Sequence, residues 1–147
     1  MEKKQLVMDI VQAAQKLINK YNIDVSYKID MIDIFPKSIE EEKQLNKEYN
    51  KISSNIKKTI HGNIYILKKE IDSIIGTINN IKVRNYDPKK KYRGAIDLIV
   101  NDFDDYKDSI EYKENINFIS NDINDFIEYE DYDIFLYVVR NSNVNSD

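Results

Sequence analysis

The sequence predicts an α+β fold: a single domain in which helices pack on one face of a largely antiparallel sheet of about four strands. Two patterns support this prediction. In some segments apolar residues recur every three or four positions, as on one face of a helix, and in others at every second position, as on one face of a strand. The alternation in the first predicted strand also indicates that one face of the sheet is covered and the other is wetter.

The first two elements have the clearest patterns. Residues 3–21 are predicted to form an amphipathic helix, whose apolar stripe consists of Leu6, Ile10, Ala14, Leu17 and Tyr21. Propensity alone leaves a helix of this length marginal, so we expect the stripe to be buried against the sheet. Residues 24–34 then alternate polar and apolar side chains, which predicts a half-buried strand that ends before Pro36.

A second helix is predicted to begin near Ser38, because Ser38 and Glu41 have the spacing of a capping box. We expect this helix to continue to Gly62, where glycine can serve as a left-handed C-cap and His61 would favour the negative end of the helix dipole. The following residues 64–75 fit either a helix or a strand. The three-four spacing of their isoleucines favours a helix that ends near Gly76.

A β-hairpin with a basic tip is predicted next. Residues 81–86 alternate, and residues 94–100 are rich in β-branched side chains. The segment between them opens with Asp87 and Pro88 and closes with Gly94, which is typical of a turn.

Three short elements complete the predicted domain, which spans residues 1–140. Residues 102–112 and 122–128 are predicted to be short helices, and residues 132–140 are predicted to be the last strand. The polar residues 141–147 are expected to form a flexible tail.

Composition excludes several classes of site and gives little sign of catalysis. The chain has no cysteine, which excludes disulfides and thiolate metal sites, and it has one histidine and three glycines. No catalytic or phosphate-binding motif is present, so we expect no cofactor and no metal, and a binding protein is favoured over an enzyme without a local motif. No apolar run is long enough for a membrane helix, and the N-terminal residues lack the apolar core of a signal peptide. A cytoplasmic location is therefore expected.

Charge is distributed unevenly along the chain, and this suggests a protein partner. Residues 1–94 carry 19 basic and 12 acidic residues, a net charge of +7, whereas residues 95–147 carry 3 and 14, a net charge of −11. Acidic and aromatic residues are interleaved in the second part, and they could bind a basic protein surface. The candidate partner-binding residues are Asp104, Asp105, Tyr106, Glu128, Tyr129, Glu130 and Tyr132. Internal charge compensation and head-to-tail self-association are the alternatives.

The basic segment 82–93 supports a second, less favoured hypothesis. It interleaves positive side chains with Tyr86 and Tyr92, which is the general chemistry of a nucleic-acid or anionic-ligand contact. The candidate anion-binding residues are Lys82, Arg84, Lys89, Lys90, Lys91 and Arg93. Lysines at an exposed turn also protect a sheet edge from aggregation, so the same residues fit a purely structural role.

Overall fold

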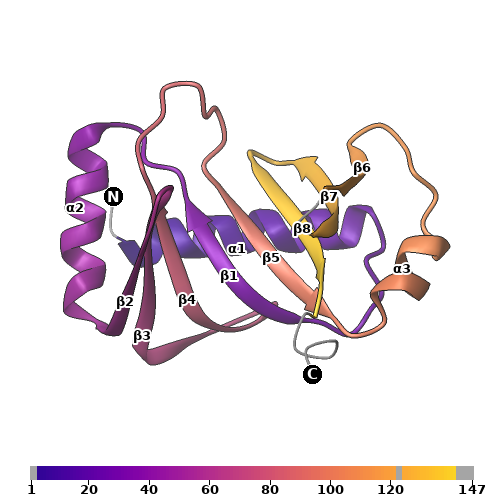
Figure 1. Cartoon of the computed structure of the whole chain (residues 1–147), viewed down its shortest axis with the longest axis horizontal. Helices are drawn as coiled ribbons and strands as arrows, with labels where there is room; N and C mark the ends of the chain where they lie inside the picture. The colour runs from indigo at the N-terminus through magenta and orange to yellow at the C-terminus, as the bar shows by residue number, and fades with distance from the viewer. Residues whose placement is uncertain (1–2, 122–123, 142–147) are drawn as a thin grey trace.

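A computed structural model describes residues 3–121 and 124–141 of the chain. In this part of the chain eight strands form one mixed sheet, in the order β2-β3-β4-β1-β5-β8-β7-β6 (Figure 1). The pairs β1/β4 and β5/β8 are parallel, and the other neighbouring pairs are antiparallel. The strands are β1 (Lys28–Ile34), β2 (Ser53–Thr59), β3 (Gly62–Ser73), β4 (Gly76–Arg84), β5 (Gly94–Val100), β6 (Ile116–Ser120), β7 (Asp125–Asp131) and β8 (Ile134–Arg140).

The helices lie on one face of this sheet and enclose the core with it. They are α1 (Lys3–Lys20), α2 (Ile39–Lys51) and α3 (Phe103–Ser109), and α1 crosses the central strands (Figure 1). The predicted first helix is confirmed up to Lys20, and Leu6, Ile10, Ala14 and Leu17 of its stripe are at most 1% exposed. Tyr21, the last residue predicted for the stripe, lies in the turn after the helix and is half-buried. Tyr49 of α2 and Phe103 of α3 belong to the same core cluster. None of the helices in the described ranges is long and apolar enough to cross a membrane.

The start of α2 confirms the predicted capping. The Ser38 hydroxyl accepts a hydrogen bond from the Glu41 amide at 3.0 Å. The Glu41 carboxylate reaches back to the amide of Lys37, at 2.9 Å, and not to that of Ser38 as an ideal capping box would. Two amide groups at the start of the helix are thereby satisfied.

The Ser38→Ala variant is expected to lower the free energy of unfolding by about 0.5–2 kcal/mol, because the Glu41 amide loses its acceptor. Urea denaturation of the variant and the wild type would measure the difference. The Ser54→Ala variant is a suitable control, since the Ser54 hydroxyl is exposed and only donates to a carbonyl at 3.3 Å. Equal losses in the two variants would contradict the capping role.

The predicted sheet of about four antiparallel strands is wrong. Residues 53–73 were expected to be helical, but they form the antiparallel pair β2 and β3, and Gly62 lies at the turn of this hairpin, not at a helix end. Gly62 has a φ of +145°, and a Cβ there would lie 2.1 Å from the Val83 carbonyl oxygen. Residues 125–131 were expected to be helical in part and instead form β7, whose neighbour is β6. The remainder of the predicted helix 122–128 includes residues 122 and 123, which lie outside the described residues.

The predicted hairpin of residues 81–100 is also wrong. Both segments are strands, β4 and β5, but β1 lies between them, parallel to β4 and antiparallel to β5. Residues 85–93 therefore form a crossover loop that passes the end of β1 (Figure 1). The last strand, β8, confirms the prediction for residues 134–140, whereas Tyr132 and Asp133 form the turn before it. The predicted tail lies outside the described residues after Asn141.

Candidate protein-binding face

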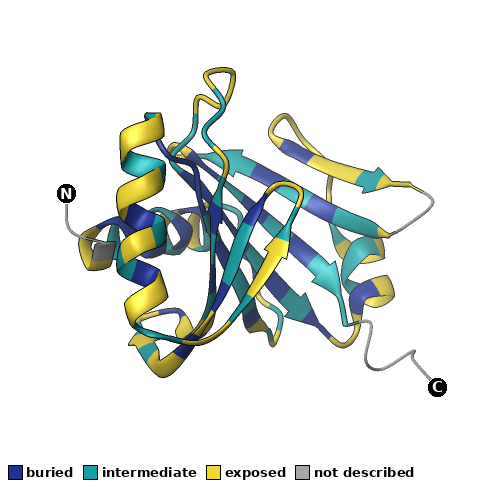
Figure 2. Cartoon of the chain, turned by 60° about the vertical axis from the view of Figure 1, so that its left-hand side comes forward, coloured by how far each residue is buried: buried dark blue, intermediate teal, exposed yellow. Residues whose placement is uncertain are grey.

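The face of the sheet opposite the helices, here called the open face, is not packed against a helix in the described part of the chain. Alternate residues of each central strand point to it, and apart from the small, buried Ala95 they are half-buried, whereas their neighbours in the core are buried (Figure 2). The polar and aromatic side chains on this face include Asp33, Asp97, Phe126, Glu128, Glu130, Phe135 and Tyr137.

One row of cross-strand neighbours brings the most distinctive of these side chains together. Asp97 of β5 pairs with Met31 of β1 on one side and with Tyr137 of β8 on the other, and Tyr137 pairs with Glu128 of β7. Directly opposed residues of an antiparallel pair, such as Tyr137 and Glu128, have Cβ atoms about 4.5–5.5 Å apart, and neighbouring strands of any sheet lie about 4.7–4.9 Å apart. Tyr137 therefore lies between two acidic side chains, from Asp97 and Glu128.

Aromatic rings form a contiguous group on the same face. Phe126 and Tyr137 meet edge to face with ring centroids 5.2 Å apart, and Phe135 and Tyr137 are stacked at 5.9 Å. Tyr92, from the crossover loop, lies 4.8 Å from Phe135, and its hydroxyl donates to the Glu130 carboxylate. The loop lysines Lys89, Lys90 and Lys91 and the rings of Phe35, Tyr92 and Phe135 border a hollow of about 430 Å³ at this end of the face.

The carboxyl group of Asp97 is the most perturbed acid of the open face. Burial raises the pKa of Asp97 to about 8, and the negative charges of Asp33 and Asp30 add to the increase, while Lys82 and Arg84 oppose it. Asp97 makes no ion pair in the described part of the chain. Perturbed acids of this kind are characteristic of functional sites, although structural networks also produce them.

Two other acids of the face, Asp33 and Glu128, have polar partners. Burial raises the pKa of Asp33, and this effect is opposed by the Arg84 guanidinium, which donates a hydrogen bond to Asp33 at 3.0 Å. Burial also raises the pKa of Glu128, and side-chain hydrogen bonds with Asn117 and Tyr137 oppose that increase. Asp97 is thus distinguished from Asp33 by the absence of a cation at ion-pair distance among the described residues.

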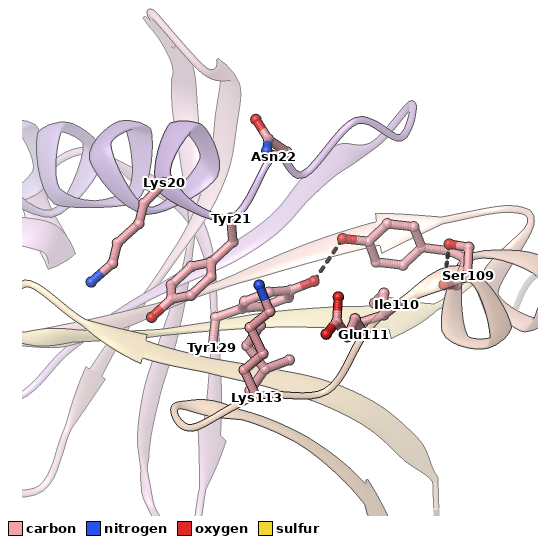
Figure 3. A pocket seen from close by; sticks show the side chains of 10 residues that line it. Lys20, Tyr21, Asn22, Ser109, Ile110, Glu111, Lys113 and Tyr129 are labelled. Carbon is pink, nitrogen blue, oxygen red and sulfur yellow. Dashed lines mark hydrogen bonds between the residues drawn. The ribbon is translucent and has the colours of Figure 1, made fainter.

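The predicted partner-binding residues are divided between two sides of the sheet. Glu128 and Glu130 lie on the open face, and Tyr132 lies at the β7–β8 turn with a φ of +53°. Tyr129 is buried on the helix side, where its hydroxyl is 2.7 Å from that of Tyr106. Both tyrosines line a pocket of about 240 Å³ between the end of α1 and the segment after α3. Figure 3 shows Tyr129 among the side chains around this pocket.

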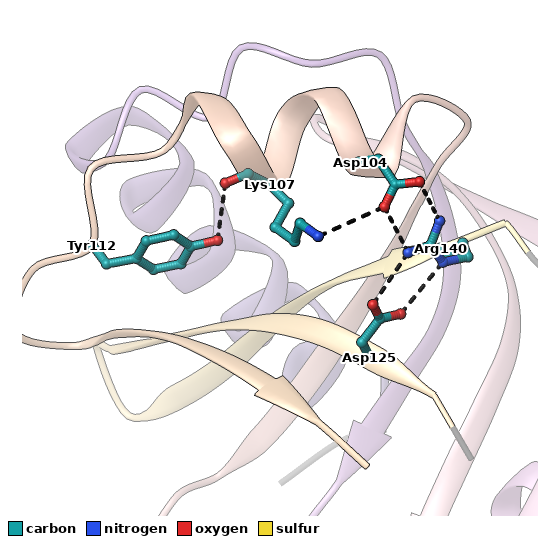
Figure 4. A network of polar contacts seen from close by, with 5 residues as sticks. All are labelled: Asp104, Lys107, Tyr112, Asp125 and Arg140. Atoms are coloured by element: carbon teal, nitrogen blue, oxygen red, sulfur yellow. Dashed lines mark hydrogen bonds and ion pairs between the residues drawn. The ribbon is translucent and has the colours of Figure 1, made fainter. Parts of the chain in front are cut away.

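The remaining acidic candidates lie at α3. Asp104 forms a bidentate ion pair with Arg140, at 2.8 and 2.9 Å, and Arg140 also contacts Asp125 (Figure 4). Asp105 is exposed on the same helix. The structure therefore does not bring Asp104 and Asp105 to the surface that contains Glu128 and Glu130.

The predicted anion-binding residues are separated in the same way. Arg93 is held by a bidentate ion pair with Glu41, at 2.8 and 2.9 Å, and Arg84 is paired with Asp33. Lys82 lies beside Asp33 in the sheet. Lys89, Lys90 and Lys91 are exposed on the crossover loop, and none of them takes part in an ion pair with another described residue.

No metal or histidine site stands out among the described residues. They contain no group of three or more His, Asp or Glu side chains arranged to hold a metal ion. His61 is exposed in the turn between β2 and β3, and the role predicted for it at a helix end is wrong.

Sequence reasoning missed Asp97 and the aromatic group of Phe126, Phe135 and Tyr137, and it considered Tyr92 only as part of the anion-binding segment. A signal was available in residues 125–131, where Phe126, Glu128 and Glu130 alternate with Ile127 and Tyr129. This alternation predicts a strand with an acidic and aromatic outer face. The approach of Asp97 to Tyr137 depends on the parallel pairing of β5 and β8, which local patterns do not specify.

Comparison with known proteins gives a fold and no function. No protein-family model matches the chain, and no curated protein matches it. A solved structure described as "Structural Genomics, Protein EC4020" superposes with a TM-score of 0.68 at 7% sequence identity, and the match covers 88% of this chain and 81% of that one. At this identity the likeness shows that the two chains share a fold.

Proposed function

We propose that this chain is a small binding or regulatory protein that acts through contact with another protein, and that the open face is its binding surface. The observation that supports the proposal most strongly is the meeting of acidic and aromatic side chains on a sheet face that no helix covers in the described part of the chain. Aromatic residues are enriched at protein interfaces, and a surface of one charge sign selects partners of the other sign.

The charge balance of the structure favours a basic partner. Within the described residues, Lys20 and Asp131 form an ion pair that joins the basic and acidic parts of the sequence, while the other ion pairs lie within one part. The acidic excess of residues 95–147 is therefore largely uncompensated by direct pairing. The acidic excess of residues 95–147 repels nucleic acid, which is why a protein partner is favoured over the anion-binding alternative.

Charge reversal on the open face tests this proposal. The immobilised wild-type chain is expected to retain a partner protein from a cell extract at low salt. The double variant Glu128→Lys/Glu130→Lys is expected not to retain it. The matched control is Asp105→Lys/Asp108→Lys, which makes the same change of charge at exposed positions of α3. The captured protein would be identified, purified and measured for binding to each variant by calorimetry.

The two variants show whether the partner binds to the open face or at α3. Loss of binding in the open-face variant alone supports the proposal, and circular dichroism would confirm that this variant is folded. Loss in the α3 variant alone would move the binding surface to α3. If the wild-type chain captures no protein in a salt-sensitive manner, the proposal is wrong.

A further inference from the structure

We propose that the open face receives an arginine side chain of its protein partner, with the guanidinium paired to the Asp97 carboxylate and stacked on the ring of Tyr137. This inference rests on the proposed function, because it names the chemistry that the partner would bring to the same surface.

The chain holds two of its own arginines between an aromatic ring and carboxylates. The Arg84 guanidinium lies 5.4 Å from the centroid of the Phe35 ring and donates to Asp33 at 3.0 Å. The Arg140 guanidinium lies 4.7 Å from the Phe103 centroid, and Asp104 accepts from it at 2.8 and 2.9 Å. Both sites combine cation–π attraction with charge-assisted hydrogen bonds.

Asp97 and Tyr137 repeat this combination without the cation. They are direct neighbours on β5 and β8, and Glu128 lies on the other side of Tyr137. None of the ion pairs in the described ranges includes Asp97 or Glu128. The Asp97 carboxyl group is also partly withdrawn from water, so ionisation is unfavourable unless a positive charge lies nearby.

The geometry favours arginine over lysine. A guanidinium is planar, so it can stack on Tyr137 while its N–H groups point toward carboxylates at the side of the ring. An ammonium group is a compact, strongly hydrated charge, and it would lose more hydration on entering a half-buried site.

A titration of Asp97 followed by carbon NMR tests the inference directly. The probe is N-acetylarginine amide, and the control is N-acetylcitrulline amide, a neutral molecule of nearly the same shape. Both are used at millimolar concentrations in buffers matched for ionic strength. The arginine probe is expected to lower the pH midpoint of the Asp97 carboxyl carbon, because a bound cation favours the ionised acid. The citrulline probe should leave the midpoint unchanged, and Asp105 serves as an exposed internal reference.

The result that overturns the inference is an Asp97 midpoint that does not move with the arginine probe, or that moves equally with citrulline. Partner capture separates this failure from failure of the proposed function. If the Asp97→Asn variant still binds the partner as tightly as the wild type while Glu128→Lys/Glu130→Lys does not, the open face is the binding surface and the arginine contact at Asp97 is wrong. If both variants bind as the wild type does, both proposals are wrong.

Discussion

The Asp97→Asn variant is expected to be more stable than the wild type at pH 9, by a few kcal/mol. In the folded protein burial raises the pKa of Asp97 to about 8, whereas an unfolded chain would leave it near its usual value of 3.8. Between these values the folded state holds a proton that the unfolded state releases, so stability falls as the pH rises. Asparagine cannot ionise and removes this cost.

The comparison at two pH values makes the expectation specific. At pH 3 the acid is protonated in both states, so the variant and the wild type should unfold at similar urea concentrations. At pH 9 the variant should require more urea. An Asp105→Asn variant controls for the loss of one negative charge at an exposed position. A variant that is no more stable than the wild type at pH 9 would contradict the raised pKa. Stabilisation would show that the native aspartate is retained at a cost, as functional residues often are.

The Leu17→Ala variant is expected to lose about 2–5 kcal/mol of unfolding free energy, because deletion of a buried side chain removes transfer free energy and leaves a cavity. Leu17 is fully buried in the core between α1 and the sheet. Chemical denaturation monitored by circular dichroism would measure the loss.

An exposed apolar residue provides the control for Leu17. Ile60, in the turn between β2 and β3, is 85% exposed, and the Ile60→Ala variant should change stability by less than about 0.5 kcal/mol. A small effect at Leu17 would mean that α1 contributes less to the core than its burial indicates.

The error over residues 53–73 has a specific physical origin. Ile52, Ile56 and Ile60 are separated by four positions, and this separation keeps residues on one face of a helix and also on one face of a strand. The spacing alone therefore could not decide between the two structures. The partners that stabilise the strands, β4 for β3 and β3 for β2, decide in favour of the sheet. By contrast α1 and α2 were predictable, because an apolar stripe and a capping residue are local signals.

The sequence predicted the kinds of residue in the candidate site, but not all of the residues that form it. The sequence pointed to acidic and aromatic residues of the second part, and the structure keeps Glu128 and Glu130 in the surface now proposed. It removes Tyr129, because alternate residues of β7 point to opposite faces. It adds Asp97 and Tyr137, which are forty residues apart in sequence and become neighbours through the β5/β8 pairing. Such pairings depend on the whole topology.

The position of β1 between β4 and β5 has a consequence for how the chain can fold. β1 is made early in synthesis, yet both of its hydrogen-bonding neighbours come from later parts of the chain. Folding cannot proceed simply by adding each new strand to the edge of the last one, since a gap must be kept or reopened for β1. Pairing strands that are far apart in sequence closes a long loop, and the chain loses conformational entropy before the native contacts can compensate for it. Such pairings therefore slow folding. Until β5 has left the ribosome, one edge of β1 lacks its native partner and is open to pairing with other chains.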